Sequence, residues 1–322
     1  MSAKAAGKKS QTPFKIFLKS IGLYFLNFDK FALYMTFPVL GQAAGLGLIL
    51  LTTFFYTSNL PRLMVLFPSL NNFNTLILLS VLITLPGLVL LIKAFWEYLV
   101  AYGAVNSMLD NMLKSGKVYD FRAHTELVKR RTPAFAGLWF VAGIFSIIAL
   151  CPLCWIICAI LAVYFVLIFQ VFTFEPEQNP LGCAKRSLEL IKGHFASTFL
   201  LLILAGVLTY IFIPQVCVKL FDIIGVNYFF AGLISPLSDI MPDLNFPWLS
   251  AAGDISLLLV QTWISSIFIQ YTLPMRSVMW SLWYKELNKE KGPSEKLMEK
   301  SRKKYGKKKL DENILRRATE KD

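Results

Sequence analysis

Long apolar runs alternate with short polar segments along this chain of 322 residues. A helix rises about 1.5 Å per residue, so about 20 apolar residues are needed to cross the hydrocarbon core of a bilayer. The run 135–174 is about twice that length and has Pro152 near its centre, so we expect two helices joined by a tight turn there. The pattern predicts an all-α membrane bundle with six spans, at about 31–56, 76–97, 135–150, 155–174, 198–217 and 251–274.

Polar segments ahead of three apolar runs have the periodicity of amphipathic helices. Within residues 12–28 one face is apolar and another is basic, a pattern typical of a helix in the headgroup region. The apolar face consists of Phe14, Phe17, Leu18, Ile21, Phe25 and Phe28. Similar segments start near residues 121 and 183 and, like the first, enter an apolar run through a Phe-Ala dipeptide. The order predicts a threefold repeat of an interfacial helix followed by a transmembrane hairpin.

Composition and charge placement agree with a membrane protein. The chain is 56% hydrophobic and 16% charged, against roughly 25% charged in a soluble domain. Thirty of its 33 Lys and Arg residues fall in segments that the six-span order places on one side of the membrane. By the positive-inside rule, both termini are expected in the cytoplasm. We expect no cleaved signal peptide, because the basic start is not followed by an uninterrupted apolar region.

Three regions follow from this charge pattern. Residues 1–30 form a basic N-terminus with the first amphipathic helix, 31–284 the membrane domain, and 285–322 a basic cytoplasmic tail. An aromatic belt of Trp280, Trp283 and Tyr284 is expected where the membrane domain meets the tail. Acidic residues are interspersed with the basic ones of the tail, which favours anionic lipid over nucleic acid as its partner.

The basic residues of the amphipathic segments are candidate contacts for anionic lipid headgroups. In the segment after Pro180, Ala184, Leu188 and Ile191 make an apolar stripe, and the basic side chains are expected to face headgroups and water. The candidate lipid contacts are Lys15, Lys19, Arg130, Arg131, Lys185, Arg186 and Lys192.

Polar residues in the last predicted span form a candidate transport stripe, because polar groups in a bilayer often mark a solute pathway. They are Asp254, Gln261, Thr262, Ser265 and Gln270. The alternative is that the hydroxyl and amide groups join neighbouring helices and Asp254 complements a helix dipole.

Cys151 and Cys154 form a C-x-x-C pair beside Pro152, a spacing found in thiol–disulfide oxidoreductases. The alternative is a proline turn flanked by small apolar thiols. His124 and His194 lie in basic segments without the carboxylate or cysteine spacing of a metal site. We therefore expect no metal, no cofactor and no catalytic site.

One motif resembles a known family. The pattern of an acidic residue followed by AxKRSxxLIKGxF is similar to the membrane domain fused to some bacterial glycerophosphoryl diester phosphodiesterases, and to related stand-alone bacterial membrane proteins. The matching residues are Glu175, Ala184, Lys185, Arg186, Ser187, Leu190, Lys192, Gly193 and Phe195. The resemblance implies a six-helix bundle in a bacterial cytoplasmic membrane and implies no known activity.

These features predict a non-enzymatic integral membrane protein that is structural, lipid-associated or accessory to a membrane protein complex. A small-solute transporter using the polar stripe with Gln42 and Gln170, and a membrane thiol–disulfide oxidoreductase, are the alternatives.

Overall fold

The structure is a computed structural model that describes residues 12–118, 121–148, 151–238 and 255–291. These residues are 91% helical and contain no strand, as the all-α prediction requires. The helices are α1 (Pro13–Leu26), α2 (Phe28–Leu66), η1 (Pro68–Asn71), α3 (Phe73–Ser115), α4 (Phe121–Lys129), α5 (Thr132–Ile148), η2 (Pro152–Cys154), α6 (Trp155–Phe165), α7 (Ile168–Phe174), α8 (Pro180–Ile191), α9 (Phe195–Gly206), η3 (Val207–Phe212), α10 (Ile213–Ile223), α11 (Val226–Ser238), α13 (Ile255–Tyr271) and α14 (Leu273–Lys291).

Five helical stretches in the described part of the chain are long and apolar enough to cross a bilayer, which indicates a membrane protein. They are Phe28–Thr53, Phe73–Ser115, Trp155–Phe174, Phe195–Ile223 and Ser256–Lys291. The remaining predicted span, 135–150, corresponds to α5, whose 17 residues make it shorter than a typical span.

The first two long helices exceed their predicted bounds. α2 has 39 residues and contains Pro38 and Pro61, and α3 has 43 residues and contains Pro86. α3 continues well past the end of its apolar run at residue 97 because Val105 and Met108 are completely buried by other parts of the protein. Tertiary packing thus keeps a segment helical where hydropathy alone predicts the start of a loop.

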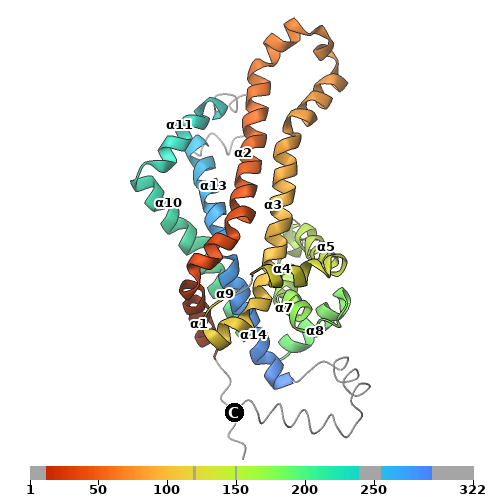
Figure 1. The fold of residues 1–322 in the computed structure, drawn as a ribbon, viewed down its shortest axis with the longest axis vertical. Coiled ribbons are helices and arrows are strands. Elements are labelled where there is room, and N and C mark those ends of the chain that lie inside the picture. The colour runs from red at the N-terminus through yellow and green to blue at the C-terminus, as the bar shows by residue number, and fades with distance from the viewer. Residues whose placement is uncertain (1–11, 119–120, 149–150, 239–254, 292–322) are drawn as a thin grey trace, which may run out of the picture. The chain divides into compact units, whose positions relative to one another are not determined.

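The chain divides into two compact units, and each is described separately. The first unit comprises Met1–Leu26, Gly103–Ile203 and Met275–Asp322, and the second comprises Asn27–Tyr102 and Leu204–Pro274. Figure 1 shows the helices by label, coloured along the chain.

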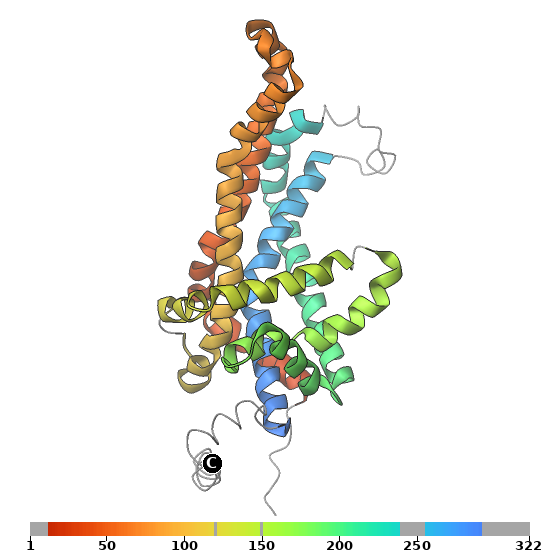
Figure 2. The same cartoon turned by 90° about the vertical axis from the view of Figure 1, so that its right-hand side faces the viewer.

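A helical hairpin forms one part of the second unit, where α2 and α3 run side by side in opposite directions (Figures 1 and 2). Small residues let the two backbones approach closely. A Cβ added to Gly45 would lie 2.7 Å from the backbone nitrogen of Leu91, and one added to Gly87 would lie 2.9 Å from the carbonyl oxygen of Gly45. The G-x-x-x-G spacing of Gly41 and Gly45 is therefore used for helix packing.

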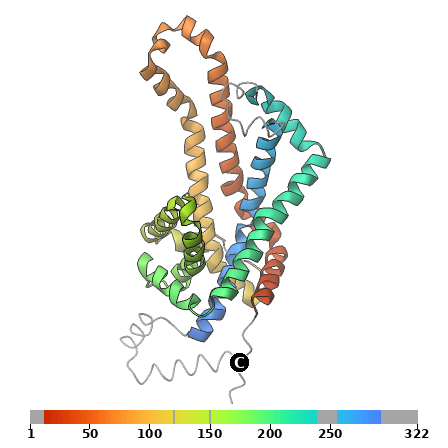
Figure 3. The same cartoon turned by 180° about the vertical axis from the view of Figure 1, so that it is seen from behind.

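The helices α10, α11 and α13 form the other part of the second unit (Figure 3). They pack around a small apolar cluster. The chain reaches α10 through the π-helical segment η3, which lies directly ahead of Pro214. Since proline has no backbone N–H to donate, a local change of hydrogen-bond register is expected at this place. The cluster consists of Val218, Ala231, Val260 and Ile264.

The first unit is built around α14, which is buried on every side over much of its length. Trp280, Trp283 and Tyr284 are 5%, 2% and 3% exposed, so the prediction of an aromatic belt at the membrane surface is wrong. Trp283 Nε1 donates to Thr198 Oγ1 at 3.0 Å inside the protein. The helix continues to Lys291, beyond the predicted start of the tail at residue 285.

The three predicted amphipathic segments correspond to α1, α4 and α8, which precede the apolar helices α2, α5 and α9. Each is separated from the following helix by a short turn or a single residue. Each amphipathic helix therefore leads into an apolar helix, and the threefold repeat stays a prediction.

Candidate functional site

The turn between α7 and α8 brings a buried carboxylate and a buried guanidinium together. Glu175 ends α7, with its backbone N–H donating to the Val171 carbonyl at 2.7 Å, and Pro176 cannot continue the helix. Asn179 then caps α8, its side chain accepting from the Gly182 backbone N–H at 2.7 Å. Two helix ends therefore fix the backbone around Glu175.

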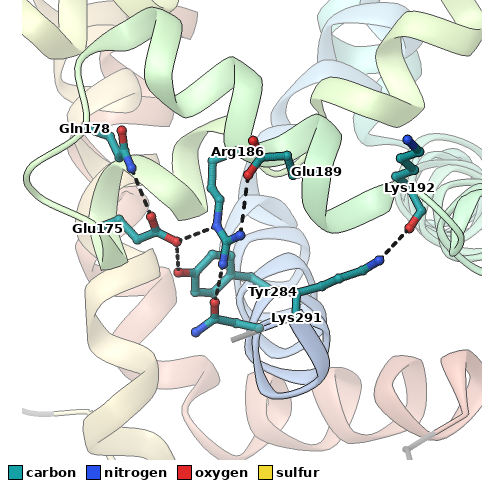
Figure 4. A network of polar contacts seen from close by, with 8 residues as sticks. Glu175, Gln178, Arg186, Glu189, Lys192, Tyr284 and Lys291 are labelled. Atoms are coloured by element: carbon teal, nitrogen blue, oxygen red, sulfur yellow. Dashed lines mark hydrogen bonds and ion pairs between the residues drawn. The ribbon is translucent and has the colours of Figure 1, made fainter. Parts of the chain in front are cut away.

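Figure 4 shows the carboxylate of Glu175 surrounded by donors from α8, from α14 and from its own turn. Its Oε1 accepts from Arg186 Nε at 3.0 Å and from Tyr284 OH at 2.9 Å. Its Oε2 accepts from Gln178 Nε2 at 3.3 Å. The side chains of Glu175 and Arg186 are only 2% and 7% exposed, so this ion pair is shielded from solvent.

The guanidinium of Arg186 has two further partners. It donates to Asn288 Oδ1 at 2.9 Å and lies 3.6 Å from the carboxylate of Glu189. The expectation that Arg186 faces lipid headgroups is therefore wrong. The physical reason is that a buried carboxylate requires a countercharge, and Glu175 lies too far along the chain for helical periodicity to reveal the pairing.

Other residues of the AxKRSxxLIKGxF motif have structural contacts as well. Ser187 Oγ donates to the Tyr164 carbonyl at 2.7 Å, and Leu190 is completely buried. Gly193 has a φ of +91°, a conformation that residues with a side chain rarely adopt, and it makes the turn from α8 into α9. The motif thus describes how α8 is held in place.

Polar contacts join the end of α14 to the turn between α8 and α9. Lys291 Nζ donates to the Lys192 carbonyl at 3.0 Å, and His194 Nε2 lies 3.0 Å from Glu290 Oε2. Because the His194 and Glu290 side chains are 26% and 36% exposed, this second pair is more accessible to water than the Glu175 pair.

A second polar cluster joins α3, α7 and α14. Gln170 Nε2 donates to Asn106 Oδ1 at 3.1 Å, and the same oxygen accepts from the hydroxyls of Ser277 and Ser281. One helical turn further along α3 and α14, Lys285 pairs with Asp110. Gln170 was predicted only as a candidate for a solute pathway, and its partner Asn106 was not predicted. An uncharged amide within apolar surroundings was the signal that the sequence offered for Asn106.

Five of the seven predicted lipid contacts are exposed: Lys15, Lys19, Arg130, Lys185 and Lys192. Besides Arg186, the exception is Arg131, which is half-buried. Its guanidinium donates to the Phe172 carbonyl at 2.6 Å and lies 3.9 Å from the centre of the Phe172 ring. Burial lowers the pKa of Arg131 below its ordinary value.

The outward face of α8 alternates apolar and basic side chains at helical spacing. Leu181 and Leu188 are 75% and 42% exposed, and Lys185 and Lys192 are exposed between and beyond them. The predicted stripe of Ala184, Leu188 and Ile191 is wrong in detail, since Ile191 is completely buried. Leu188 faces outward, and Leu181 accompanies it where Ile191 was predicted.

In the second unit, the polar residues of α13 do not form one continuous face. Gln261 Nε2 donates to both oxygens of Asp222, at 3.1 and 3.2 Å, and Asn227 Nδ2 donates to the same carboxylate at 2.6 Å. Thr262 is exposed, and its hydroxyl donates to the Leu258 carbonyl of its own helix.

Two other members of the predicted stripe, Ser265 and Gln270, are uncharged. Ser265 is half-buried, and Gln270 Nε2 lies 3.5 Å from Ser266 Oγ, at the limit of a hydrogen bond. Asp254 lies outside the described residues. The structure therefore connects Gln261 to a carboxylate on α10 and leaves Thr262 exposed.

Cys151 and Cys154 lie on the short turn η2, and both are free thiols. Cys151 is exposed and Cys154 is partly exposed. A hydrogen bond with Cys151, and to a lesser extent burial, raises the pKa of the Cys154 thiol above its ordinary value.

The two histidines have different partners. His124 Nδ1 lies 2.6 Å from Ser107 Oγ, and its Nε2 lies 3.1 Å from Asn111 Nδ2, while His194 pairs with Glu290. Across residues 12–118, 121–148, 151–238 and 255–291, no three His, Cys, Asp or Glu side chains are grouped so that they could hold a metal ion.

Comparison of the chain with protein-family models, with curated proteins and with solved structures found no match. The resemblance to the phosphodiesterase membrane domain therefore stays a prediction, and the candidate function depends on the geometry of the site.

Proposed function

We propose that this protein is a non-catalytic integral membrane protein that binds anionic lipid through the outward faces of α1 and α8 and has a structural or accessory role. The observation that carries the proposal is the two-sided character of α8. Arg186, on its inner side, is neutralised by Glu175, while Lys185 and Lys192, on its outer side, are exposed next to exposed leucines.

This arrangement has the chemistry of a helix at a membrane surface. Exposed leucines insert into the acyl boundary, and lysine side chains extend along apolar surface to place their ammonium groups among phosphates. α1 supports the same reading, because Phe14, Leu18 and Phe25 are 56%, 52% and 61% exposed next to exposed Lys15 and Lys19. Its inner face is buried.

The orientation proposed for the protein has both termini in the cytoplasm of a bacterial cell, with α1, α4 and α8 at the inner leaflet. The placement of Lys and Arg supports this orientation. Single-cysteine variants test it. Arg130→Cys in a background without the natural cysteines should react with a membrane-impermeant maleimide only after the cells are opened, and labelling in intact cells would contradict the orientation.

Native mass spectrometry of the full chain in neutral detergent tests lipid binding, with titration of phosphatidylglycerol against phosphatidylcholine. Each surface lysine contributes about 1 kcal/mol of attraction to anionic lipid. Lys185→Gln/Lys192→Gln should therefore weaken phosphatidylglycerol binding by roughly tenfold or more and leave phosphatidylcholine binding unchanged.

Two controls make the experiment specific. Lys185→Arg/Lys192→Arg should retain phosphatidylglycerol binding, since the positive charge is kept. Lys289→Gln removes an exposed lysine that already pairs with Glu286 at 3.1 Å, and it should have little effect. Equal phosphatidylglycerol binding by the glutamine variant and the unmodified protein would refute the proposal.

A further inference from the structure

The polar cluster of α3, α7 and α14 has an unusual balance of donors and acceptors. Its four side chains, Asn106, Gln170, Ser277 and Ser281, are all 0% exposed. Valines next to them on the three helices, Val105, Val171 and Val278, are also 0% exposed. Bulk water therefore does not reach the cluster, and each polar atom needs a partner within the protein.

Two atoms of the cluster have no such partner among the described residues. Asn106 Oδ1 accepts three hydrogen bonds, while Asn106 Nδ2 and Gln170 Oε1 are buried without any. One unmatched group is a donor, and the other is an acceptor. They belong to the two amides that are already hydrogen-bonded to each other.

The imbalance does not depend on how the amides are oriented. If both amides were rotated by 180°, Asn106 would donate to Gln170 and to the serine hydroxyls, which can also accept. Asn106 Oδ1 and Gln170 Nε2 would then be unmatched. In either orientation one donor and one acceptor are left over, so side-chain assignment does not remove the requirement for a ligand.

We propose that Asn106 and Gln170 hold an internal water molecule, which accepts from one amide and donates to the other. Water is the smallest ligand with both capacities, and buried waters typically make about three hydrogen bonds to otherwise unsatisfied groups. The nitrogen and oxygen of a carboxamide are about 2.2 Å apart, so the unmatched atoms lie near the existing 3.1 Å contact. The site is independent of the lipid-binding faces of the proposed function.

The consequence is a hydrated layer where α3, α7 and α14 meet. A bridging water satisfies both amides without bringing the helices closer together, and it retains the short hydrogen bonds to the serines. Without the water, two buried polar groups would each cost about 1–3 kcal/mol of stability.

Radiolytic footprinting of the full chain in detergent tests the proposal, because hydroxyl radicals formed from a bound water label buried side chains beside it. Trp280 is 5% exposed and lies three residues after Ser277, the spacing at which side chains share a helix face. We expect Trp280 to be oxidised at several times the rate of Trp283, which is 2% exposed on the same helix and bonds to Thr198 away from the cluster.

Gln170→Met supplies the matched variant, since methionine has a similar length and cannot bind water. It should lower the oxidation of Trp280 to the level of Trp283, while the variant stays folded as judged by size-exclusion chromatography. If Gln170→Met does not fold, Gln170→Glu keeps an acceptor at this position and should retain the labelling. Oxidation of Trp280 at the Trp283 rate in the unmodified protein would overturn the proposal, as would labelling unchanged in Gln170→Met.

Discussion

The two units of the molecule use different means to hold their helices together. In the second unit, α2 and α3 approach through glycines, and α10, α11 and α13 share an apolar cluster. In the first unit, a buried ion pair and a buried layer of amides and hydroxyls connect helices that are far apart in sequence. Steric fit therefore contributes most of the contacts described in the second unit, beside one polar network at Asp222, whereas the first unit depends on matched polar partners.

Breaking the buried ion pair should have the largest effect. Glu175→Gln leaves Arg186 buried without its countercharge, which costs about 3–5 kcal/mol of unfolding free energy. Unfolding by titration with a denaturing detergent measures this change. Glu189→Gln is the control, because Glu189 is 47% exposed and lies 3.6 Å from the same guanidinium; it should cost less than about 1 kcal/mol.

A paired variant distinguishes lost charge balance from lost packing. Glu175→Gln/Arg186→Met removes both charges, so it should be more stable than Glu175→Gln alone. If the double variant is less stable than the single variant, the guanidinium stabilises the first unit through contacts other than Glu175.

Crowding the glycine contact should have the next largest effect, on the second unit. Gly45→Ala places a methyl group against the Leu91 backbone and should destabilise the protein by about 1–3 kcal/mol. Gly47→Ala is the matched control on the same helix. A Cβ at Gly47 meets nothing within 4 Å, so this change should be neutral or stabilising, because alanine favours helix. Equal effects of the two changes would show that the close approach is unimportant.

The polar residues of α13 provide a smaller test. Gln261→Leu removes a donor to the Asp222 carboxylate and should cost about 1–3 kcal/mol. Thr262→Val should cost less than about 0.5 kcal/mol, because the Thr262 hydroxyl is exposed and bonds only within its own helix. A transporter would show loss of solute uptake in Thr262→Val at unchanged stability, and that result would favour the stripe as a pathway.

The exposed pair at the end of α14 should contribute least. Glu290→Gln removes the partner of His194, and both side chains are partly exposed, so the loss should be below about 1 kcal/mol and should shrink at high salt. Thermal unfolding at low and high salt measures the loss of stability and its dependence on salt. A loss as large as that of Glu175→Gln would mean that burial does not distinguish the two ion pairs.

Hydropathy predicted the helices of both units better than their contacts. In the second unit, the apolar runs at 31–56 and 76–97 correspond to α2 and α3, and in the first unit the three amphipathic segments correspond to α1, α4 and α8. These features are local, since periodicity and length are properties of a few neighbouring residues.

The contacts of the first unit could not be derived in the same way. The partner of Glu175 is 11 residues away, and Tyr284, which completes the network, is 109 residues away. A buried arginine and a headgroup-facing arginine have the same helical spacing, so the sequence assigned Arg186 to the wrong side of α8. Similarly, α14 was divided between a belt and a tail, because charged residues at its end obscure a helix that is buried.

The central position of α14 has a consequence for biosynthesis. Asn106 and Glu175 are made early, yet the hydroxyls of Ser277, Ser281 and Tyr284 that they bind are made late. During translation, Asn106 and Glu175 are therefore without these partners until α14 has been synthesised. Completion of the polar contacts in the first unit is thus a late event in biosynthesis.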